Sequence, residues 1–462
     1  MRLAWGQIED PGQRANFESL ARKYRFQALG KACLEDGIQS LFVAHHEDDQ
    51  AETVMMRMMS GHRVLGLVGM KEVSGIPECY GLHGIGQSGG VDLTSQSQVE
   101  KFDYATSMDL KSRGHDRPGP LVIERGGIKV YRPLLPFNKS RLIATCQRED
   151  MEWFEDHTNK DPSLTRRNAV RHIFRSATLP TALKPESMIL LSERCKKRDR
   201  SLNSAAQKIF EESFLSSFNT RTGTLIIRFA HANHISSLNL SQTSADKGII
   251  AALLLRQVVT FVTPDEHVHL YSLHGAVGKI FPEIVGQTSS ETVSPTPFTV
   301  SGVRFQPLFP QRDKSSCRYQ KFEWQVSRQP HSSIPSARPL IVVPRSEHGK
   351  WSEWELYDGR FWIRVRNCSS FSVVVRPFHK DDMQNFKQTQ AGRELLKNHG
   401  PELVRWTLPA IAIRDQNSRE RVVALPTLDL TATGFERNVN WEVRYKSVDV
   451  DSLYARELCI VK

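Results

Sequence analysis

The first 70 residues alternate between helix-type and strand-type hydrophobic patterns. Residues 16–36 place apolar residues at helical spacing, which predicts an amphipathic helix. A short apolar run at 41–44 predicts a buried strand. A second helix is predicted over 48–60, with Asp48 as its N-cap and Gly61 at its end. Helix, buried strand, tight turn and helix in this order indicate an α/β domain with a parallel sheet.

The rest of the chain divides by composition. Residues 71–128 are rich in Gly, Ser, Gln and Asp and lack periodicity, which predicts a long insertion in the first domain. We expect three parts: an α/β domain over 1–180, a helical middle region over 181–285, and a mixed, β-rich C-terminal domain over 286–462. Within the last part, Tyr357-Asp358-Gly359-Arg360 predicts a β-hairpin turn.

Charge and cysteine content narrow the function class. The 462 residues include 62 Lys and Arg against 51 Asp and Glu, a formal net charge of +11. This suits an RNA or phosphate partner, although a solvated basic surface has the same composition. The 7 cysteines form no C-x-x-C pair, which argues against a disulfide scaffold, a structural zinc site and a thiol redox pair, and favours a reducing compartment. No apolar run reaches the roughly 18 residues of a membrane span, so we expect no membrane partner.

The densest chemical signal is the segment His45-His46-Glu47-Asp48-Asp49-Gln50-Ala51-Glu52-Thr53. Four of its carboxylates crowd the start of the predicted helix, where the helix dipole favours each by roughly 0.3–1 kcal/mol. An over-capped helix is therefore one interpretation. Asp49 and Glu52 share a helix face, however, and with Asp48 they concentrate more negative charge than capping requires. The cluster suits a cation, either Mg²⁺ on Asp48 and Asp49 bridging to phosphates or a substrate ammonium.

The same segment resembles the H-H-x-D-D-Q-A-E-T signature of the tRNA(Ile)-lysidine synthase family, which belongs to the PP-loop ATP pyrophosphatases. Arg132-Pro133-Leu134-Leu135 is similar to the family's R-P-L-L element. Arg167-Asn168-Ala169-Val170-Arg171, after Trp153 and Asn159, resembles its W…N…R-N-x-x-R stretch. The resemblance covers roughly residues 16–70 and 130–175, with the motifs in the family's order.

The resemblance implies a PP-loop-type adenylation domain over 1–180 followed by tRNA-binding parts. It implies that ATP adenylates the C2 carbonyl oxygen of the wobble cytidine in a CAU-anticodon isoleucine tRNA, and that the ε-amine of free L-lysine then displaces AMP. The site residues that we assign on this basis fall into four groups: catalytic His46, Asp48 and Asp49; lysine-binding Asp49 and Glu52; ATP-phosphate-binding Arg22, Arg25 and His46; and tRNA-binding Arg166, Arg167, Asn168 and Arg171. A solvated helix face is the other interpretation of the last group.

The chain departs from the family at its start. Family members carry a strand and an S-G-G-x-D-S loop that cradles ATP phosphates, and no such loop precedes residue 16. We therefore expect a parallel sheet that is N-terminally truncated, in a chain that alone is a poor ligase. Ser88-Gly89-Gly90-Val91-Asp92 spells most of the loop, but no apolar strand precedes it, so it is a weak candidate for phosphate binding.

Two other functions stay open. One is a non-catalytic tRNA-binding protein derived from such an enzyme, and the other is a tRNA thiolation enzyme of the same superfamily. The sequence does not set the oligomeric state, and a homodimer is one arrangement that it allows. It does not set the compartment either; a mitochondrial role is compatible with lysidine-type decoding, which belongs to bacteria and organelles.

Overall fold

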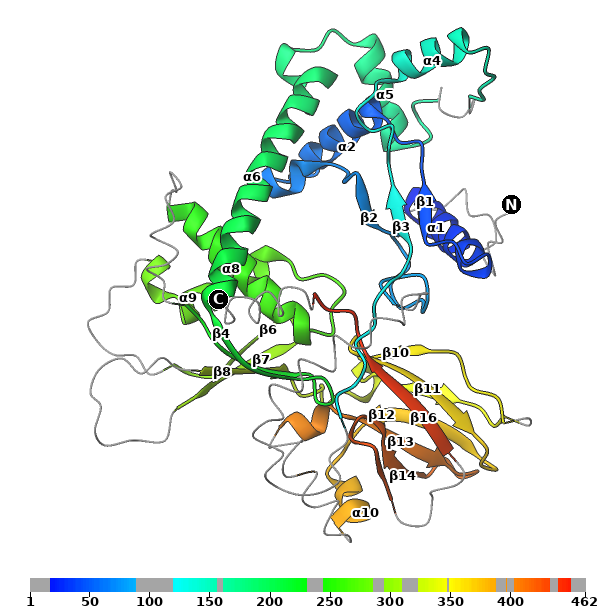
Figure 1. Cartoon of the computed structure of the whole chain (residues 1–462), viewed down its shortest axis with the longest axis vertical. Coiled ribbons are helices and arrows are strands. Elements are labelled where there is room, and N and C mark those ends of the chain that lie inside the picture. Colours follow the sequence, from blue (N-terminus) through cyan, green and yellow to red (C-terminus); the bar gives the residue numbers. More distant parts are fainter. Residues whose placement is uncertain are drawn as a thin grey trace, which may run out of the picture. The chain divides into compact units, whose positions relative to one another are not determined.

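The computed structural model describes residues 17–88, 119–155, 161–230, 244–285, 295–309, 323–346, 349–387, 396, 403–432 and 439–449. The chain forms two compact units (Figure 1). Unit 1 comprises Met1–Tyr80, Gly84–Gln87 and Gly127–Ser204, and unit 2 comprises Gly81–His83, Ser88–Gly126 and Ala205–Lys462. The expected boundary at residue 180 and the three-domain organisation stay predictions beside this division.

Unit 1 combines helices with one small sheet. Its helices are α1 (Phe17–Glu35), α2 (Glu47–Met59), α4 (Lys139–Arg148), α5 (Arg166–Ser176) and the first part of α6 (Pro185–Glu212), with 3₁₀ turns at Val64–Val68 and Thr181–Leu183. Its strands are β1 (Ser40–Phe42), β2 (Val73–Gly75) and β3 (Lys129–Tyr131). The helices predicted over 16–36 and 48–60 are thereby confirmed.

The sheet of unit 1 differs from the all-parallel sheet that we expected. Its order is β1-β3-β2, and β1 runs parallel to β3 as predicted. β2 is antiparallel to β3, so the described sheet is mixed. The Arg132 side chain, directly after β3, also binds the β2 segment: its guanidinium donates to the Lys71 carbonyl and the Ser74 hydroxyl at 2.9 and 3.1 Å. The pattern missed β2 because it lies in the Gly- and Ser-rich stretch that we assigned to the insertion.

Two local expectations in unit 1 are wrong. The N-cap of α2 is His46, and not Asp48, because the Asp49 carboxylate accepts the His46 backbone N–H at 3.0 Å. β1 is also not a buried strand, since Phe42 is 66% exposed and stacks on Tyr131. The side of α2 that is apolar does pack as expected, against α5 and α6, through Ala51, Val54, Met55, Val170 and Met188.

Unit 2 is built mainly from antiparallel sheets. Its helices are the end of α6, α8 (Ser244–Val262), α9 (His274–Ile280) and α10 (Gln384–Lys387), with 3₁₀ turns at Leu270–Leu273, Pro282–Val285, Pro335–Ala337, Asp381–Met383, Val404–Thr407 and Pro426–Leu428. Its strands are β4 (Phe214–Asn219), β5 (Thr224–Arg228), β6 (Phe298–Val300), β7 (Val303–Leu308), β8 (Glu323–Arg328), β9 (Ile341–Val343), β10 (Glu355–Tyr357), β11 (Phe361–Asn367), β12 (Ser372–Pro377), β13 (Pro409–Arg414), β14 (Glu420–Leu425), β15 (Leu430–Thr431) and β16 (Val439–Tyr445).

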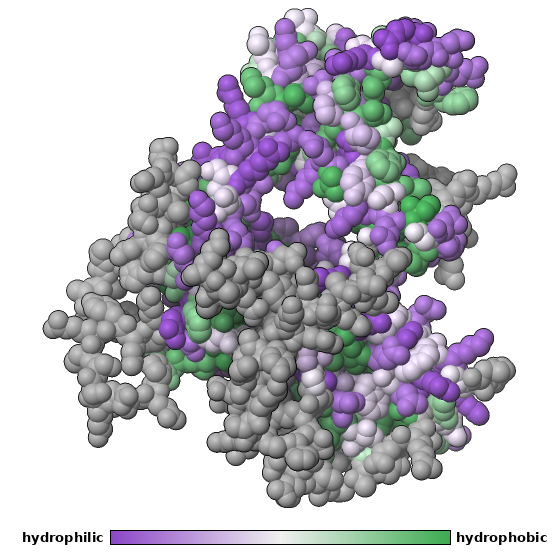
Figure 2. Space-filling view, in the orientation of Figure 1, coloured by the Kyte–Doolittle hydropathy of each residue, from purple (hydrophilic) through white to green (hydrophobic). Residues whose placement is uncertain are grey.

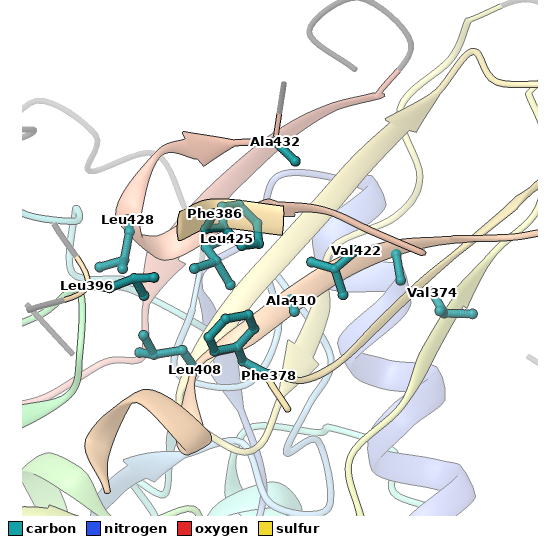
Figure 3. Close-up of a cluster of buried hydrophobic side chains, with 11 residues drawn as sticks. Val374, Phe378, Phe386, Leu396, Leu408, Ala410, Val422, Leu425, Leu428 and Ala432 are labelled. Atoms are coloured by element: carbon teal, nitrogen blue, oxygen red, sulfur yellow. The ribbon is translucent and has the colours of Figure 1, made fainter. Parts of the chain in front are cut away.

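These strands form three sheets with the orders β4-β5-β8-β7-β6, β15-β14-β13-β12-β9 and β10-β11-β16. The β4–β5 hairpin corrects the purely helical middle region that we expected over 181–285, because two strands stand between α6 and α8. The β-rich character of the C-terminal region is confirmed. Figure 3 shows the core of the second sheet, where Phe378, Leu408 and Leu425 gather with Phe386 of α10.

The turn predicted at 357–360 joins β10 to β11 as expected. Asp358 and Gly359 both have positive φ, 48° and 59°, as the central residues of a primed β-turn closed by the Arg360 N–H and the Tyr357 carbonyl require; the register pairs Tyr357 with Phe361, so residues 358–360 form the connection. A Cβ atom on Gly359 would lie 1.9 Å from the Pro264 carbonyl oxygen, so only glycine fits there.

Among the described residues, no helix has both the length and the apolar content needed to cross a membrane. Figure 2 agrees in showing hydrophilic residues over the visible surface of α4 and α6.

Candidate functional site

A polar pocket of about 950 Å³ lies within unit 1, among α1, α2, α4, α5 and the start of α6. Its lining comprises Glu18, Ala21, Arg22, Arg25, His45, His46, Asp48, Asp49, Ala51, Glu52, Lys139, Leu164, Thr165, Arg167, Asn168, Arg171, Phe174, Arg175, Pro185 and Glu186. The pocket thus brings together most of the residues that the sequence singled out, although they lie on three separate helices. Acidic side chains from α2 meet basic side chains from α1 and α5 in one cavity.

Local structure places the acidic segment at the edge of the sheet. The Val43 N–H donates to the Tyr131 carbonyl at 3.0 Å and continues the β1–β3 pairing by one residue. The Glu47 N–H donates to the Phe137 carbonyl at 2.9 Å, and α2 begins there. Asp49 then folds back over the first turn to accept the His46 N–H, which leaves it 9% exposed. In parallel sheets ligands bind at this carboxyl edge of the strands.

Glu52 is held by an arginine of α5. Arg171 donates from Nε to Oε1 at 2.7 Å and from Nη2 to Oε2 at 3.0 Å, and Glu52 is 2% exposed. The Arg171 Nη2 atom also lies 3.6 Å from Asp49 Oδ1. Arg167 adds a contact of 3.8 Å to Glu52 and donates to the Thr53 hydroxyl at 3.2 Å. The two motifs that carry the resemblance are therefore joined by a bidentate ion pair.

Burial and charge shift several pKa values in the pocket. Burial raises the pKa of Glu52, and the bond from Arg171 opposes that shift. Burial alone would lower the pKa of Arg171, but the hydrogen bond and charge of Glu52 outweigh it and raise that pKa. Burial and nearby arginines lower the pKa of His45 against the opposing pull of Asp49, so its ring is neutral at pH 7. Burial, Asp48 and Glu186 raise the pKa of Glu47.

Several buried polar atoms of the lining have no hydrogen-bond partner among the described residues. They are Nδ1 of His45, Nδ1 of His46 and Nε of Arg167. Buried polar atoms are normally satisfied, so unpaired ones that face a cavity suit a polar ligand. Asp48 also lines the pocket, and within the described ranges its carboxylate makes no hydrogen bond or ion pair.

The remaining predicted residues are placed less centrally. Arg166 is exposed at the start of α5 and does not line the pocket. Asn168 is buried, and its side chain donates to the Asp161 carbonyl at 2.9 Å. Ser88 is buried in unit 2, whereas Gly89, Gly90 and Asp92 lie outside the described residues. In the part of the chain that the structure describes, no three His, Cys, Asp or Glu side chains gather as metal ligands, and the Asp48–Asp49 magnesium site stays a prediction.

Sequence reasoning assigned no site role to five ionisable residues of the lining, which are Glu18, His45, Lys139, Arg175 and Glu186. His45 stands inside the quoted signature, so its position was an available signal. Glu18 and Lys139 start helices whose facing sides only the tertiary structure reveals. Lys139 lies 3.0 Å from Glu155.

Other residues of the signature hold the pocket wall rather than line it. The Gln50 amide donates to the Met70 carbonyl at 3.2 Å and accepts the Met70 N–H at 2.7 Å. Arg57 donates to the carbonyls of Gly66 and Gly69 at 3.1 and 3.0 Å. These bonds fix the turn after α2, so these two side chains have a structural role.

The sequence profile of a PP-loop domain matches residues 1–82 and 119–177. The unmatched residues 83–118 lie inside the predicted insertion at 71–128. The PP-loop domain is thus found in this chain, which corrects the expectation that its PP-loop part is lacking.

Among curated proteins, a probable tRNA(Ile)-lysidine synthase of Schizosaccharomyces pombe is 23% identical over 433 residues, which are 92% of this chain and 76% of that protein. The tRNA(Ile)-lysidine synthase of Wolbachia pipientis wMel is 27% identical over 164 residues, 36% of this chain and 26% of the relative. The enzyme of Streptococcus agalactiae is 42% identical over 76 residues, 15% of this chain and 18% of the relative. The chain thus spans about three quarters of the yeast protein and about a quarter or less of these bacterial ones.

The shorter bacterial matches and the profile match agree with the motifs that the sequence presented. The chain therefore carries a PP-loop domain and is homologous to tRNA(Ile)-lysidine synthases.

Proposed function

We propose that this chain modifies isoleucine tRNA with a CAU anticodon by joining free L-lysine to C2 of the wobble cytidine. ATP first transfers AMP to the C2 carbonyl oxygen and releases pyrophosphate. The lysine ε-amine then bonds to C2. The bond between C2 and its oxygen breaks, and AMP leaves carrying that oxygen. The observation that carries the proposal is a single cavity in which the carboxylates of Asp48 and Asp49 face the buried ring nitrogens of His45 and His46 and the arginines of α1.

The basic side of the pocket suits the phosphates of ATP, whose use the PP-loop family implies. Arg22 and Arg25 come from α1, while Nδ1 of His45, Nδ1 of His46 and Nε of Arg167 are buried without a hydrogen bond among the described residues. The Arg167 Nε atom lies 3.8 Å from Glu52. Cationic and N–H donors already fixed around a cavity stabilise charge that develops on phosphate oxygens, without reorganisation during the reaction. In the proposal these residues hold and orient the triphosphate, and His46 contacts the α-phosphate as AMP is transferred.

The acidic side suits a substrate ammonium. Arg171 already neutralises Glu52, so the carboxylates that contact lysine directly are Asp48 and Asp49. Glu52 supports them by holding Arg171 in place. A carboxylate favours the charged form of the amine, so a proton must leave before attack. The neutral ring of His45 accepts that proton.

Magnesium enters the proposal through the phosphates. Mg²⁺ is usually held by one or two carboxylates, waters and substrate phosphates rather than by a full set of protein ligands. Asp48 and Asp49 supply two adjacent carboxylates at the pocket wall. The bound ion would neutralise phosphate charge, and no third protein ligand is needed.

The tRNA contacts belong to the rim of the pocket. Arg166, beside the lining, and Arg175, within it, are the exposed arginines of α5, and they suit backbone phosphates near the modified base. Each phosphate contact that is lost should reduce the salt dependence of tRNA binding by about one unit of slope.

The test uses the full chain, a CAU-anticodon isoleucine tRNA transcript, ATP, Mg²⁺ and radiolabelled lysine. We expect lysine incorporation and AMP release that depend on all three substrates, with lysidine identified by mass spectrometry of the digested tRNA. Asp49→Asn should lower incorporation at least about 100-fold, because it removes the carboxylate that binds the amine. Glu149→Gln, at an exposed ion pair of unit 1, is the matched control and should leave activity unchanged.

Two results would overturn the proposal. Tight tRNA binding without adenylated tRNA or lysidine would identify a non-catalytic RNA-binding protein. Incorporation of sulfur in place of lysine would identify a thiolation enzyme.

A further inference from the structure

The outer face of the sheet β10-β11-β16 in unit 2 carries tryptophan and arginine instead of short polar residues. Side chains alternate along β11, so Trp362, Arg364 and Arg366 point to one face while Phe361, Ile363 and Val365 point to the other. Trp362 is buried, with His83 against its ring at 4.9 Å. The strand register places Arg444 opposite Trp362 and Glu442 opposite Arg364. This face, with Trp351, Trp354 and His83, is called the Trp–Arg face below.

Cations and rings alternate across the Trp–Arg face. The Arg364 guanidinium lies 5.0 Å from the centroid of Trp351 and 4.8 Å from that of Trp354. Arg444 lies 4.7 Å from the Trp354 ring, and His83 stacks on that ring at 5.1 Å. The result is a ladder of π systems and guanidinium groups that ends at Trp351, which is partly exposed.

The segment that carries Trp351 is anchored to β11 by two hydrogen bonds. The Ser352 N–H donates to the Val365 carbonyl at 2.9 Å, and the Val365 N–H donates to the Ser352 hydroxyl at 3.0 Å, which joins the Trp351 segment to β11. Among the described residues, the Arg364 guanidinium lies over the Trp351 ring. An indole that is fixed and partly exposed loses little entropy when a flat ligand stacks on it.

The Trp–Arg face carries one arginine more than its internal ion pairs neutralise. Glu442 pairs with Arg364 at 2.7 Å, and Glu124 pairs with Arg444 at 3.1 Å. Arg366 is exposed on the same face, with its guanidinium over Gly349. One cation beside a partly exposed aromatic ring is the combination that single-stranded nucleic acids use, because bases stack on the ring and phosphates contact the cation.

We propose that the Trp–Arg face binds unpaired nucleotides of RNA, with one base stacked on Trp351 and a phosphate beside Arg366. The proposal rests on the proposed function in that the substrate is an RNA, and it adds a second contact surface that is separate from the pocket of unit 1. A purely structural ladder would bind no RNA.

The test measures fluorescence anisotropy of the full chain with an unstructured RNA octamer of uridine and adenine, at 50 and 150 mM salt. The same ribose–phosphate chain without bases is the second probe. Trp351→Leu should weaken octamer binding about 5- to 30-fold, as for one lost stacked base, and should leave abasic binding unchanged. Trp351→Phe keeps a ring and should retain most of the affinity.

The charge contact has its own variant. Arg366→Ala should weaken both probes and reduce the salt slope by about 0.7, the value for one phosphate on a single strand. Arg419→Ala removes an exposed arginine from the β13–β14 turn of the same unit and should change neither. Thermal melting and circular dichroism check that each variant is folded.

Equal affinity of wild type, Trp351→Leu and Trp351→Phe for the octamer would overturn the proposal, and so would equal affinity of wild type for the octamer and the abasic chain. Neither measurement needs ATP or lysine. Octamer binding that depends on Trp351, in a chain that forms no lysidine, would therefore reject the proposed function and support this inference.

Discussion

The buried pair between Glu52 and Arg171 offers the sharpest test of the pocket's architecture. Glu52→Gln keeps the size of the side chain and removes its charge. Arg171 then loses its closest anion and retains Asp49 at 3.6 Å. Breaking a buried ion pair by removing one partner costs about 3–5 kcal/mol. The Gln oxygen still accepts one N–H bond and the Arg171 side chain is 17% exposed, so we expect a loss of about 2 kcal/mol.

The measurement is urea-dependent hydrogen exchange of peptides from α2 and α5, which reports unit 1 by itself. Arg171→Gln should cost about 3 kcal/mol, because Glu52 is left with Arg167 at 3.8 Å. The double variant should show a coupling energy of about 1–2 kcal/mol. Glu149→Gln is the matched control: its partner Arg148 lies as close, at 2.6 Å, but the pair is exposed and should contribute less than about 0.5 kcal/mol.

A loss in Glu52→Gln no larger than in Glu149→Gln would refute the reasoning, because it would mean that burial adds nothing to this pair. So would additive losses in the double variant. Either result would leave Glu52 free to contact lysine directly, as the resemblance first implied.

Three further predictions follow from single positions. Gly69→Ala should destabilise unit 1 by about 2 kcal/mol in the same exchange experiment, because φ is +76° and the new Cβ would lie 2.7 Å from the Gln50 amide; Gly37→Ala, at φ +67° with open space around it, should cost only about 1 kcal/mol. Burial lowers the pKa of His331 to about 4, so between pH 6.5 and 4 the unfolded chain binds a proton that the folded chain does not. Urea titration of unit 2 should therefore show about 2 kcal/mol less stability at pH 5 than at pH 7.5, and His331→Gln should remove this pH-dependent part; identical pH profiles would contradict the assignment. Arg360→Met should destabilise unit 2 by about 3–5 kcal/mol in the same titration, because the fully buried guanidinium binds Asp358 and the carbonyls of Thr222 and Thr407, and a loss below about 1 kcal/mol would show that these partners find water instead.

Local patterns were sufficient for the elements that depend on neighbouring residues. The helical spacing over 16–36 and the Asp358–Gly359 turn both appear where expected. Each reports a preference of the backbone or of one helix face, which acts over a few residues. The failures are of another kind. β2 and the β4–β5 hairpin lie in stretches without clear periodicity, and strand pairing with distant partners decided their structure.

By itself, the sequence determined which chemistry is available: the acidic segment at a helix start, the basic helix and the order of motifs that indicates a PP-loop domain. Only the tertiary structure decided how these charges are used. Glu52 and Arg171 are separated by 119 positions, and nothing local to either predicts that they form a bidentate pair. The same packing leaves Asp48 at the pocket wall without a hydrogen bond or ion pair to any described residue, and it exposes Phe42. Charge is a property of each residue, whereas its neutralisation depends on which distant side chain packing brings within hydrogen-bond distance.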